Sequence, residues 1–245
     1  MQKTFFRTLI YFLLITAALP THASVSVAKP RTTTLDTDSS LKAWWTFDGK
    51  DTGTTYTLDK SGNGNLATST VVKTISGKIG QAALMNGTSD KASAMQSSTL
   101  NSFTSLSASA WVKFTGVSGM QTILRKSDGT AGNNNYQLDS NGSNFRFHIG
   151  TTASTTVTGT TTIAPNKWYQ ITGTYDGSNM YLYVNSVQEG TAAKTGTANT
   201  STTNSLFMGT TESSTAYLNG SIDDVRLYSR ALSANEVYQL YRLGL

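Results

Sequence analysis

The chain has 245 residues, no cysteine, and 19 basic against 14 acidic residues, which gives a formal net charge of +5. This length provides room for one large domain or two small ones, and for a core that needs no disulfides. Because the basic residues are scattered and nearly balanced by acids, the composition argues against a nucleic-acid-binding protein.

Residues 1–23 have the features of a secretory signal peptide. Lys3 and Arg7 form a short basic region, residues 9–19 are almost all apolar, and small residues precede a cleavage point after Ala23. The apolar run is about half of the ~20 residues that span a bilayer, so no membrane span is expected after cleavage. We therefore expect a protein that is exported, either to the periplasm or to the outside of the cell.

Residues 24–40 follow as a Ser- and Thr-rich segment that contains Pro30 and lacks apolar periodicity. Such a composition predicts a linker or a disordered arm. The folded domain is expected to span residues 41–245.

From Leu41 onward, short segments rich in β-branched and aromatic residues alternate with turn signals such as Asn-Gly and Asp-Gly. No helical periodicity separates them, which favours an all-β antiparallel sandwich or jelly roll. The expected strands are residues 41–47, 82–87, 106–114, 121–126, 135–140, 144–150, 168–176, 180–186, 205–210 and 222–228.

One short helix is predicted at the C-terminus. Ser233 is a good N-cap, and Glu236 stands three residues later, as in a capping box. Val237, Leu240 and Tyr241 then form one apolar stripe. We expect this stripe to close the domain's own core rather than to bind a partner.

Several strings along the chain carry a family resemblance: AWWTFD, GKIGQAALMNGTSDKA, LSASAWVKF and LNGSIDDVRLYSRALSANEVYQL. In this order, from about Leu41 to Tyr241, the chain resembles the laminin-G-like jelly roll of the concanavalin-A-like lectin/glucanase superfamily. The resemblance implies one concave and one convex sheet, in members that often bind glycans or proteins. Since the superfamily also includes enzymes, the fold alone does not choose the function.

Residues suited to catalysis are few. His148 is the only histidine after the presumed signal, and the Glu-x-Asp-x-(x)-Glu strand motif of the superfamily's glucanases is absent. We therefore expect a protein that is not an enzyme. The alternative is a polysaccharide lyase or hydrolase that uses Arg125, Tyr136, Gln137 and His148 on the concave sheet.

The string GSIDDVRLY contains two adjacent aspartates in an apolar strand. In a regular strand Asp224 shares a face with Arg226, whereas Asp223 shares one with Val225 and Leu227 and has no local cation. A buried carboxylate needs a partner, and Ca²⁺ accepts such oxygens.

The resemblance also implies a structural calcium between the first and last strands. Its ligands would be Asp223 with Asp48, completed by Asp90 or a backbone carbonyl near Gly87. The alternative is that these aspartates only cap turns, as Asp commonly does.

Four residues are candidates for ligand binding: Tyr136, Asn134, Arg125 and His148. Asn134 stands beside Tyr136 in AGNNNYQLD, and His148 alternates with the apolar residues of NFRFHIG. An ordinary surface loop is the alternative for the asparagines. We expect an exported, non-catalytic module that binds carbohydrate or a glycosylated surface. A structural or protein-adhesion module is a further alternative.

Overall fold

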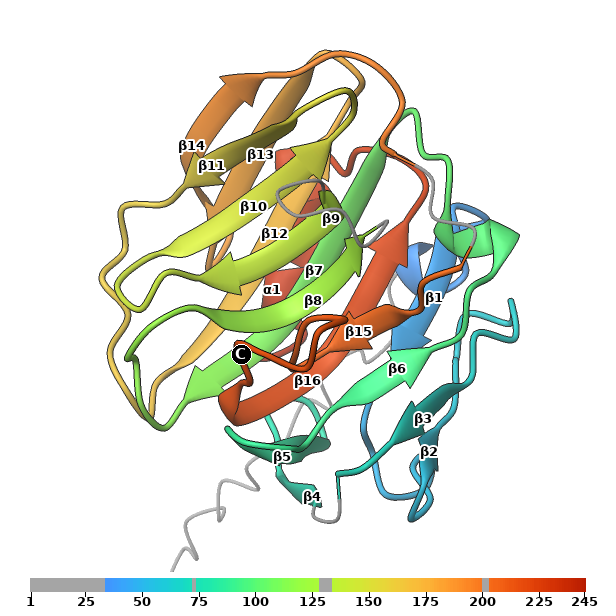
Figure 1. Ribbon diagram of the computed structural model, residues 1–245, viewed down its shortest axis with the longest axis vertical. Coiled ribbons are helices and arrows are strands. Elements are labelled where there is room, and N and C mark those ends of the chain that lie inside the picture. Colours follow the sequence, from blue (N-terminus) through green and yellow to red (C-terminus); the bar gives the residue numbers. More distant parts are fainter. Residues whose placement is uncertain (1–33, 72–73, 128–133, 200–202) are drawn as a thin grey trace, which may run out of the picture.

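The computed structural model describes residues 34–71, 74–127, 134–199 and 203–245, with the side chain of Asn134 outside this description. Two antiparallel eight-stranded sheets stack face to face as a sandwich (Figure 1). This arrangement confirms the predicted all-β jelly roll with one short C-terminal helix. The predicted signal peptide, residues 1–23, lies outside the described residues.

The first sheet has the strand order β14-β13-β12-β7-β16-β5-β4, and β1 pairs with β16 beside this path. Its strands are β1 (Leu41–Trp45), β4 (Thr74–Ser76), β5 (Gln81–Asn86), β7 (Leu106–Phe114), β12 (Trp168–Tyr175), β13 (Asn179–Val184), β14 (Val187–Ala193) and β16 (Asn219–Tyr228).

The second sheet has the order β11-β10-β9-β8-β15-β6-β3-β2. Its strands are β2 (Tyr56–Thr57), β3 (Ala67–Ser69), β6 (Ala92–Ala94), β8 (Gln121–Ser127), β9 (Asn134–Ser140), β10 (Phe145–Gly150), β11 (Ser154–Thr158) and β15 (Leu206–Met208). The short helices are η1 (Thr34–Asp36), η2 (Ser98–Leu100) and α1 (Ala234–Arg242).

The main core fills the space between the sheets. Strand residues alternate between the two faces, so each sheet contributes its apolar set inward. Trp45, Phe114 and Phe147 are fully buried there. Gly173 of β12 faces Phe147, and a Cβ at this position would overlap the aromatic ring.

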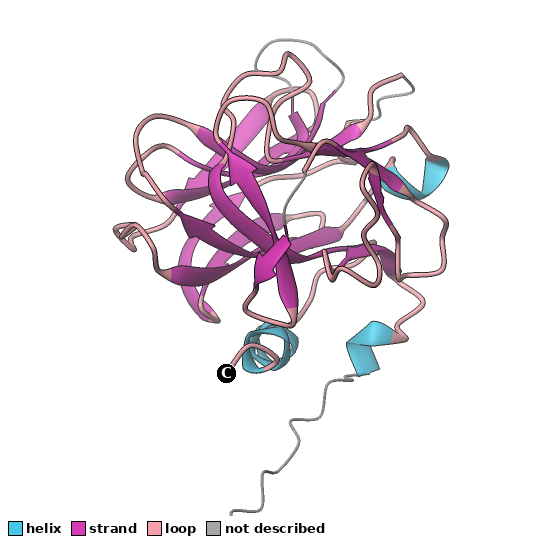
Figure 2. Ribbon diagram, turned by 90° about the horizontal axis from the view of Figure 1, so that it is seen from below, coloured by secondary structure: helices cyan, strands magenta, loops and turns pink. Residues whose placement is uncertain are grey.

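Helix α1 begins with the predicted capping box. The Ser233 side chain accepts a hydrogen bond from the backbone N–H of Glu236, and the Glu236 side chain accepts one from the backbone N–H of Ser233. The predicted stripe packs inward, as Val237 and Leu240 are buried. However, it covers the outer face of the first sheet and not the space between the sheets (Figure 2). There Tyr241 stacks on Trp111 with ring centroids 5.6 Å apart.

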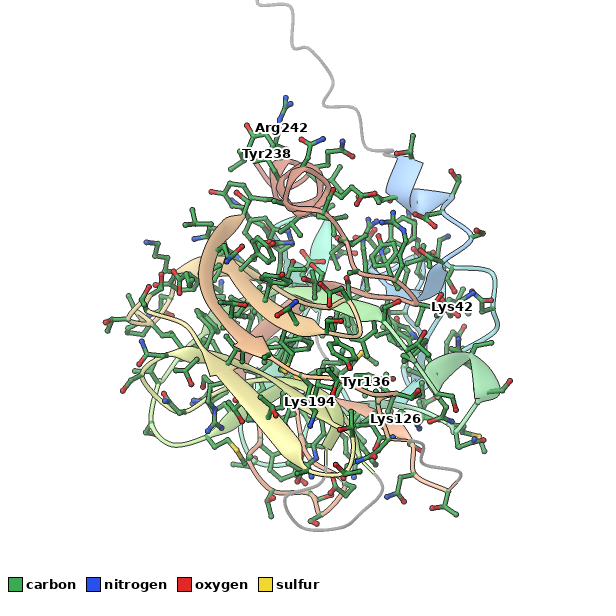
Figure 3. The ribbon with its side chains drawn as sticks, turned by 90° about the horizontal axis from the view of Figure 1, so that it is seen from above. Lys42, Lys126, Tyr136, Lys194, Tyr238 and Arg242 are labelled. Atoms are coloured by element: carbon green, nitrogen blue, oxygen red, sulfur yellow. The ribbon has the colours of Figure 1, made fainter. Side chains whose placement is uncertain are left out.

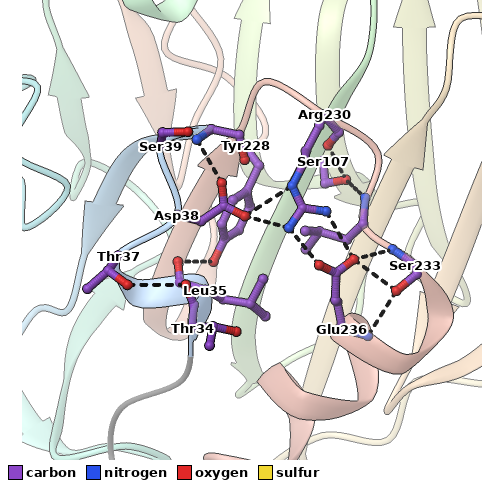
Figure 4. Close-up of polar contacts among 12 residues, drawn as sticks. Thr34, Leu35, Thr37, Asp38, Ser39, Ser107, Tyr228, Arg230, Ser233 and Glu236 are labelled. Atoms are coloured by element: carbon purple, nitrogen blue, oxygen red, sulfur yellow. Dashed lines mark hydrogen bonds and ion pairs between the residues drawn. The ribbon is translucent and has the colours of Figure 1, made fainter.

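The boundary predicted at Leu41 is too late, because residues 34–40 are part of the fold. Leu35 in η1 is buried in the same apolar cluster as Val237 and Leu240 of α1. Asp36 pairs with Arg226 at 2.5 Å. Asp38 pairs with Arg230, which also binds Glu236 (Figure 4). These acids find cations that lie about 190 residues later in the chain, which a Ser/Thr-rich composition does not reveal. The rest of the predicted arm, residues 24–33, lies outside the described residues.

Candidate functional site

A dense group of polar side chains lies on the outer face of the second sheet. In the strand register Arg125 of β8 pairs with Gln137 of β9, and Gln137 pairs with His148 of β10. Their neighbours Leu124, Tyr136, Leu138 and Phe147 point into the core, so these polar side chains point away from it. We define the polar face as Arg125, Gln137, Asp139, Arg146 and His148, with Glu212 from the loop that follows β15.

Two forked ion pairs dominate the polar face. Arg125 donates from Nε and Nη2 to Glu212 at 2.7 and 2.9 Å. Arg146 donates in the same way to Asp139 at 2.7 and 3.0 Å. Such bidentate pairs fix both side chains. Since two guanidinium groups face two carboxylates, the polar face is electrically balanced.

Gln137 connects the two ion pairs. Its Oε1 accepts from Arg125 at 2.7 Å, and its Nε2 donates to Asp139. Gln137 and Asp139 are buried, whereas the side chains of Arg125, Glu212 and Arg146 retain 12%, 18% and 22% exposure. The network is therefore held by two buried side chains, while its charged groups remain partly accessible to solvent.

His148 lies at one edge of this network. Its Nδ1 is 2.8 Å from the hydroxyl of Thr156, an exposed residue of β11. Its Nε2 lies 3.0 Å from Asp139 Oδ2, but this contact is electrostatic, since no hydrogen bond to that nitrogen is aligned. The ring thus retains hydrogen-bonding capacity on one nitrogen.

Further buried polar side chains on the same strands, Ser140 of β9 among them, lack partners within the described residues. Both amide atoms of Asn135 on β9 and the hydroxyl of Thr122 on β8 are unpaired. Leaving such a group unpaired costs about 1–3 kcal/mol, so a native protein usually has a reason for it.

The four predicted ligand-binding residues have different outcomes. Arg125 and His148 come together on the polar face, joined through Gln137. The Asn134 side chain lies outside the described residues. The prediction for Tyr136 is wrong: its ring is 1% exposed, and its hydroxyl donates to the Leu100 carbonyl at 3.0 Å.

The error at Tyr136 has a simple cause. Tyr136 alternates with Asn135 and Gln137 and shares its face with Leu138, which faces the core. Figure 3 labels it inside the body of the protein, near the buried Lys126. Burial raises the pKa of the Tyr136 hydroxyl well above its ordinary value.

Sequence reasoning missed Asp139, Arg146 and Glu212 as members of the site. Strand alternation could have found the first two, because they share faces with Gln137 and His148. Glu212 had no such signal, since it reaches Arg125 from a loop 87 residues further along the chain.

A second group of interest surrounds the turn between β4 and β5. Asp223 Oδ2 accepts from the backbone N–H groups of Lys78 and Ile79, both at 2.8 Å. Asp48 Oδ1 accepts from the backbone N–H of Gln81 at 2.8 Å. Gly80 has a positive φ and no space for a Cβ beside Asp48. The first and last strands thus meet at this turn.

Asp223 has an unsatisfied oxygen at this turn. The residue is fully buried, and its Oδ1 has no partner within the described part of the chain. Burial raises the pKa of Asp223 to about 8, and the carboxylates of Asp224 and Asp48 act in the same direction. Oδ1 is therefore the oxygen atom of Asp223 that is free to contact a cation.

The described residues offer a limited ligand set for such a cation. They contain no cluster of three or more His, Cys, Asp or Glu side chains suited to a metal ion. Asp90 lies in a different turn, where it accepts from the backbone N–H of Asn86 at 3.1 Å. A calcium beside Asp223 and Asp48 would need backbone carbonyls and water to complete its shell.

The predicted face of Asp223 requires a correction. The register of β16 shifts between Asp223 and Arg226, and Asp224 has a φ of 48°. Because of this bulge, Asp223 points to the outer face beside Trp111, while Val225 and Leu227 point into the core. The predicted pair of Asp224 with Arg226 is confirmed at 3.0 Å.

Comparison with solved structures identifies similar jelly rolls. Domain 4 of an extracellular arabinanase of glycoside hydrolase family 43 from Geobacillus stearothermophilus, in complex with arabinotriose, is 22% identical, with a TM-score of 0.65. The match covers 82% of this chain and 98% of that domain.

Two toxin domains are also similar. The binding domain of Paraclostridial Mosquitocidal Protein 1 is 16% identical (TM-score 0.65; 82% of this chain, 52% of that one). The binding domain of botulinum neurotoxin serotype G is 21% identical (TM-score 0.62; 83% and 51%). At these identities the likeness concerns the fold alone, and the chain spans about half of each toxin domain.

A search of curated proteins found no match. Within the described residues, no helix is long and apolar enough to cross a membrane. A family model matches residues 86–238, which is more than half of the chain. The protein therefore belongs to the concanavalin A-like lectin/glucanase superfamily.

Proposed function

We propose that this protein is an exported, non-catalytic module that binds carbohydrate on its polar face. The observation that carries the proposal is the fixed array of guanidinium, amide, carboxylate and imidazole groups on the outer face of the second sheet. Such planar donors and acceptors suit sugar hydroxyls, and hydrogen bonds to charged groups are the stronger ones. Among the similar structures, the arabinanase domain was solved with arabinotriose, and cell entry of botulinum neurotoxin type C depends on interaction with two ganglioside molecules.

The charge balance of the polar face favours a neutral sugar. Arg125 and Arg146 already hold a carboxylate each through two N–H groups of the guanidinium. An acidic sugar would compete with Glu212 and Asp139 for these groups and would leave a carboxylate unpaired, which is costly in a partly buried site. Neutral hydroxyls can instead add to the lone pairs and N–H groups that remain.

A polysaccharide-active enzyme is the second candidate, because His148 stands between the Thr156 hydroxyl and Asp139. Two observations weigh against it. The His148–Asp139 contact is not an aligned hydrogen bond, as an orienting partner would need to be. Tyr136, required for the lyase arrangement, is enclosed in the core.

We further propose that a structural calcium binds beside Asp223 and Asp48. The buried, unpaired Oδ1 of Asp223 supports this site, because a cation would satisfy it. Its role would be to join the first and last strands at the turn between β4 and β5. The same module would be released outside the cell or into the envelope, as its N-terminal signal sequence predicts.

A panel of neutral and acidic oligosaccharides, with arabinotriose included, tests the proposed function. We expect binding of a neutral member, and a loss of at least about tenfold in affinity for His148→Ala, equivalent to about 1.4 kcal/mol. Tyr238→Ala, on the exposed side of α1, is the matched control and should bind normally. Turnover of any panel sugar that is abolished in His148→Ala would support the enzyme instead. Absence of binding by a correctly folded protein would refute the proposal.

A further inference from the structure

The polar face belongs to a longer row that crosses the whole second sheet. Consecutive register partners continue from β2 at one edge to β11 at the other, without a break. At a strand spacing of about 4.8 Å, eight strands give a row about 34 Å long. Its members are Tyr56, Thr68, Ser93, Phe207, Arg125, Gln137, His148 and Thr156.

One end of this row is apolar and exposed. Tyr56, Leu58, Leu66 and Met95 are 42%, 41%, 47% and 76% exposed, and they make up half of the exposed large apolar side chains of the described residues. Strand alternation places them on one face, since each adjoins an inward-facing residue of the paired β2, β3 and β6. We call these four residues the apolar platform.

The platform is held in place by its surroundings. The Tyr56 ring lies against Gly53, where a Cβ would collide with it. The backbone N–H of Gly53 donates to the Tyr56 carbonyl at 2.8 Å, which fixes this turn. The exposed ring is therefore preorganised, which lowers the entropic penalty of binding on it.

The loop at residues 209–218 borders the row on one side. Its base is closed by a hydrogen bond of 2.9 Å between the Leu218 N–H and the Gly209 carbonyl. Ser214 accepts from the Lys91 ammonium at 3.1 Å, and Glu212 holds Arg125. A ligand on the polar face is thus guided along the row, with Phe207 between the polar face and the platform.

From this geometry we propose that the ligand is an internal stretch of a long, neutral polysaccharide, and not a single terminal sugar. The inference rests on the proposed function and extends it. Hydroxyl groups of some units contact the polar face, while the apolar C–H faces of further units pack on the platform. Clustered apolar surface next to a polar site is typical of ligand-binding grooves. Three of the four platform residues precede residues 86–238, so this part of the surface lies outside the family match.

Calorimetry with sugars of two lengths tests the inference. The probes are the neutral trisaccharide that binds best in the panel and a linear fragment of the same sugar more than twice as long. We expect the longer fragment to bind at least about tenfold more tightly. Tyr56→Ala combined with Leu66→Ser should remove this gain and leave the affinity for the trisaccharide unchanged.

Gly53→Ala provides a second variant, because it displaces the Tyr56 ring without deleting it, and it should reduce the same gain. Tyr238→Ala, an equally exposed tyrosine on α1, should change neither affinity. Equal affinities for the two lengths, together with no effect of the combined Tyr56→Ala and Leu66→Ser substitutions, would overturn the inference but leave the proposed function intact. If no neutral sugar of either length binds, both fall.

Discussion

Replacing Asp223 by Asn should change how the stability of the cation-free protein depends on pH. Asp223 is fully buried, and burial raises its pKa to about 8 from an ordinary value of 3.8. Between these values the folded protein holds a proton on Asp223 that the unfolded chain releases. The free energy of unfolding therefore decreases as the pH rises, by about 1.4 kcal/mol per pH unit. Asn mimics the protonated acid and should abolish this contribution.

Urea unfolding at several pH values between about 5 and 7.5, in the presence of a chelator, measures this slope. Other groups titrate as well, so the informative quantity is the difference between the wild type and Asp223→Asn. That difference should grow in favour of the variant as the pH rises. Asp90→Asn, in the separate turn, is the control and should retain the wild-type slope. Parallel curves for the wild type and Asp223→Asn would refute the reasoning.

Calcium adds an independent arm to this experiment. If calcium binds beside Asp223, the carboxylate is ionised in the folded state, and excess calcium should stabilise the wild type most at high pH. Asp223→Asn should respond much less. If the stability of the wild type depends on pH in the same way with and without calcium, the proposed metal site is wrong. The explanation by a buried, protonated Asp223 would still hold.

Two further predictions concern the core and α1. Gly173→Ala should lower the free energy of unfolding by about 1–3 kcal/mol, because the added methyl group overlaps Phe147. If Gly173→Ala lowered the free energy of unfolding equally in a protein that already carries Phe147→Leu, this explanation would be contradicted. Hydrogen bonding to Arg230 lowers the pKa of Glu236 to about 2, so its stabilising effect is present above the ordinary value of 4.5 and is lost as the pH falls towards 2. Glu236→Gln should thus lower the thermal midpoint at pH 7 but not near pH 2, and a constant difference would contradict the ion-pair explanation.

The fold could be predicted because its determinants are local. Alternation and turn residues located most strands, and the Ser233–Glu236 capping box located α1. The placement of η1 could not be predicted in this way, since Asp36 and Asp38 depend on arginines far along the chain. Nor could the bulge at Asp224, which reverses the face of Asp223, because no glycine or proline signals it.

The candidate site was predictable only where one strand determined it. The alternation in residues 144–150 correctly placed His148 on the face opposite Phe147. The same rule, applied to β9, would have excluded Tyr136 and selected Gln137 and Asp139. Pairs such as Arg125 with Glu212 arise when a loop folds back over the sheet, and this cannot be deduced from strand periodicity.

The packing of the chain ends favours the second sheet as the face that carries the proposed ligand site. A jelly roll has two outer faces. The outer face of the first sheet is partly covered by α1 and residues 34–40, which lie over Leu41 and Tyr228. Ion pairs from Arg226 and Arg230 hold these segments in place. The outer face of the second sheet instead presents partly exposed charged groups and, at its edge, exposed apolar side chains. If the ligand binds on the second sheet, deleting residues 34–40 should lower the free energy of unfolding but leave the sugar affinity unchanged at a temperature where the variant is folded. If the ligand site lay beside α1, the same deletion would also lower the sugar affinity.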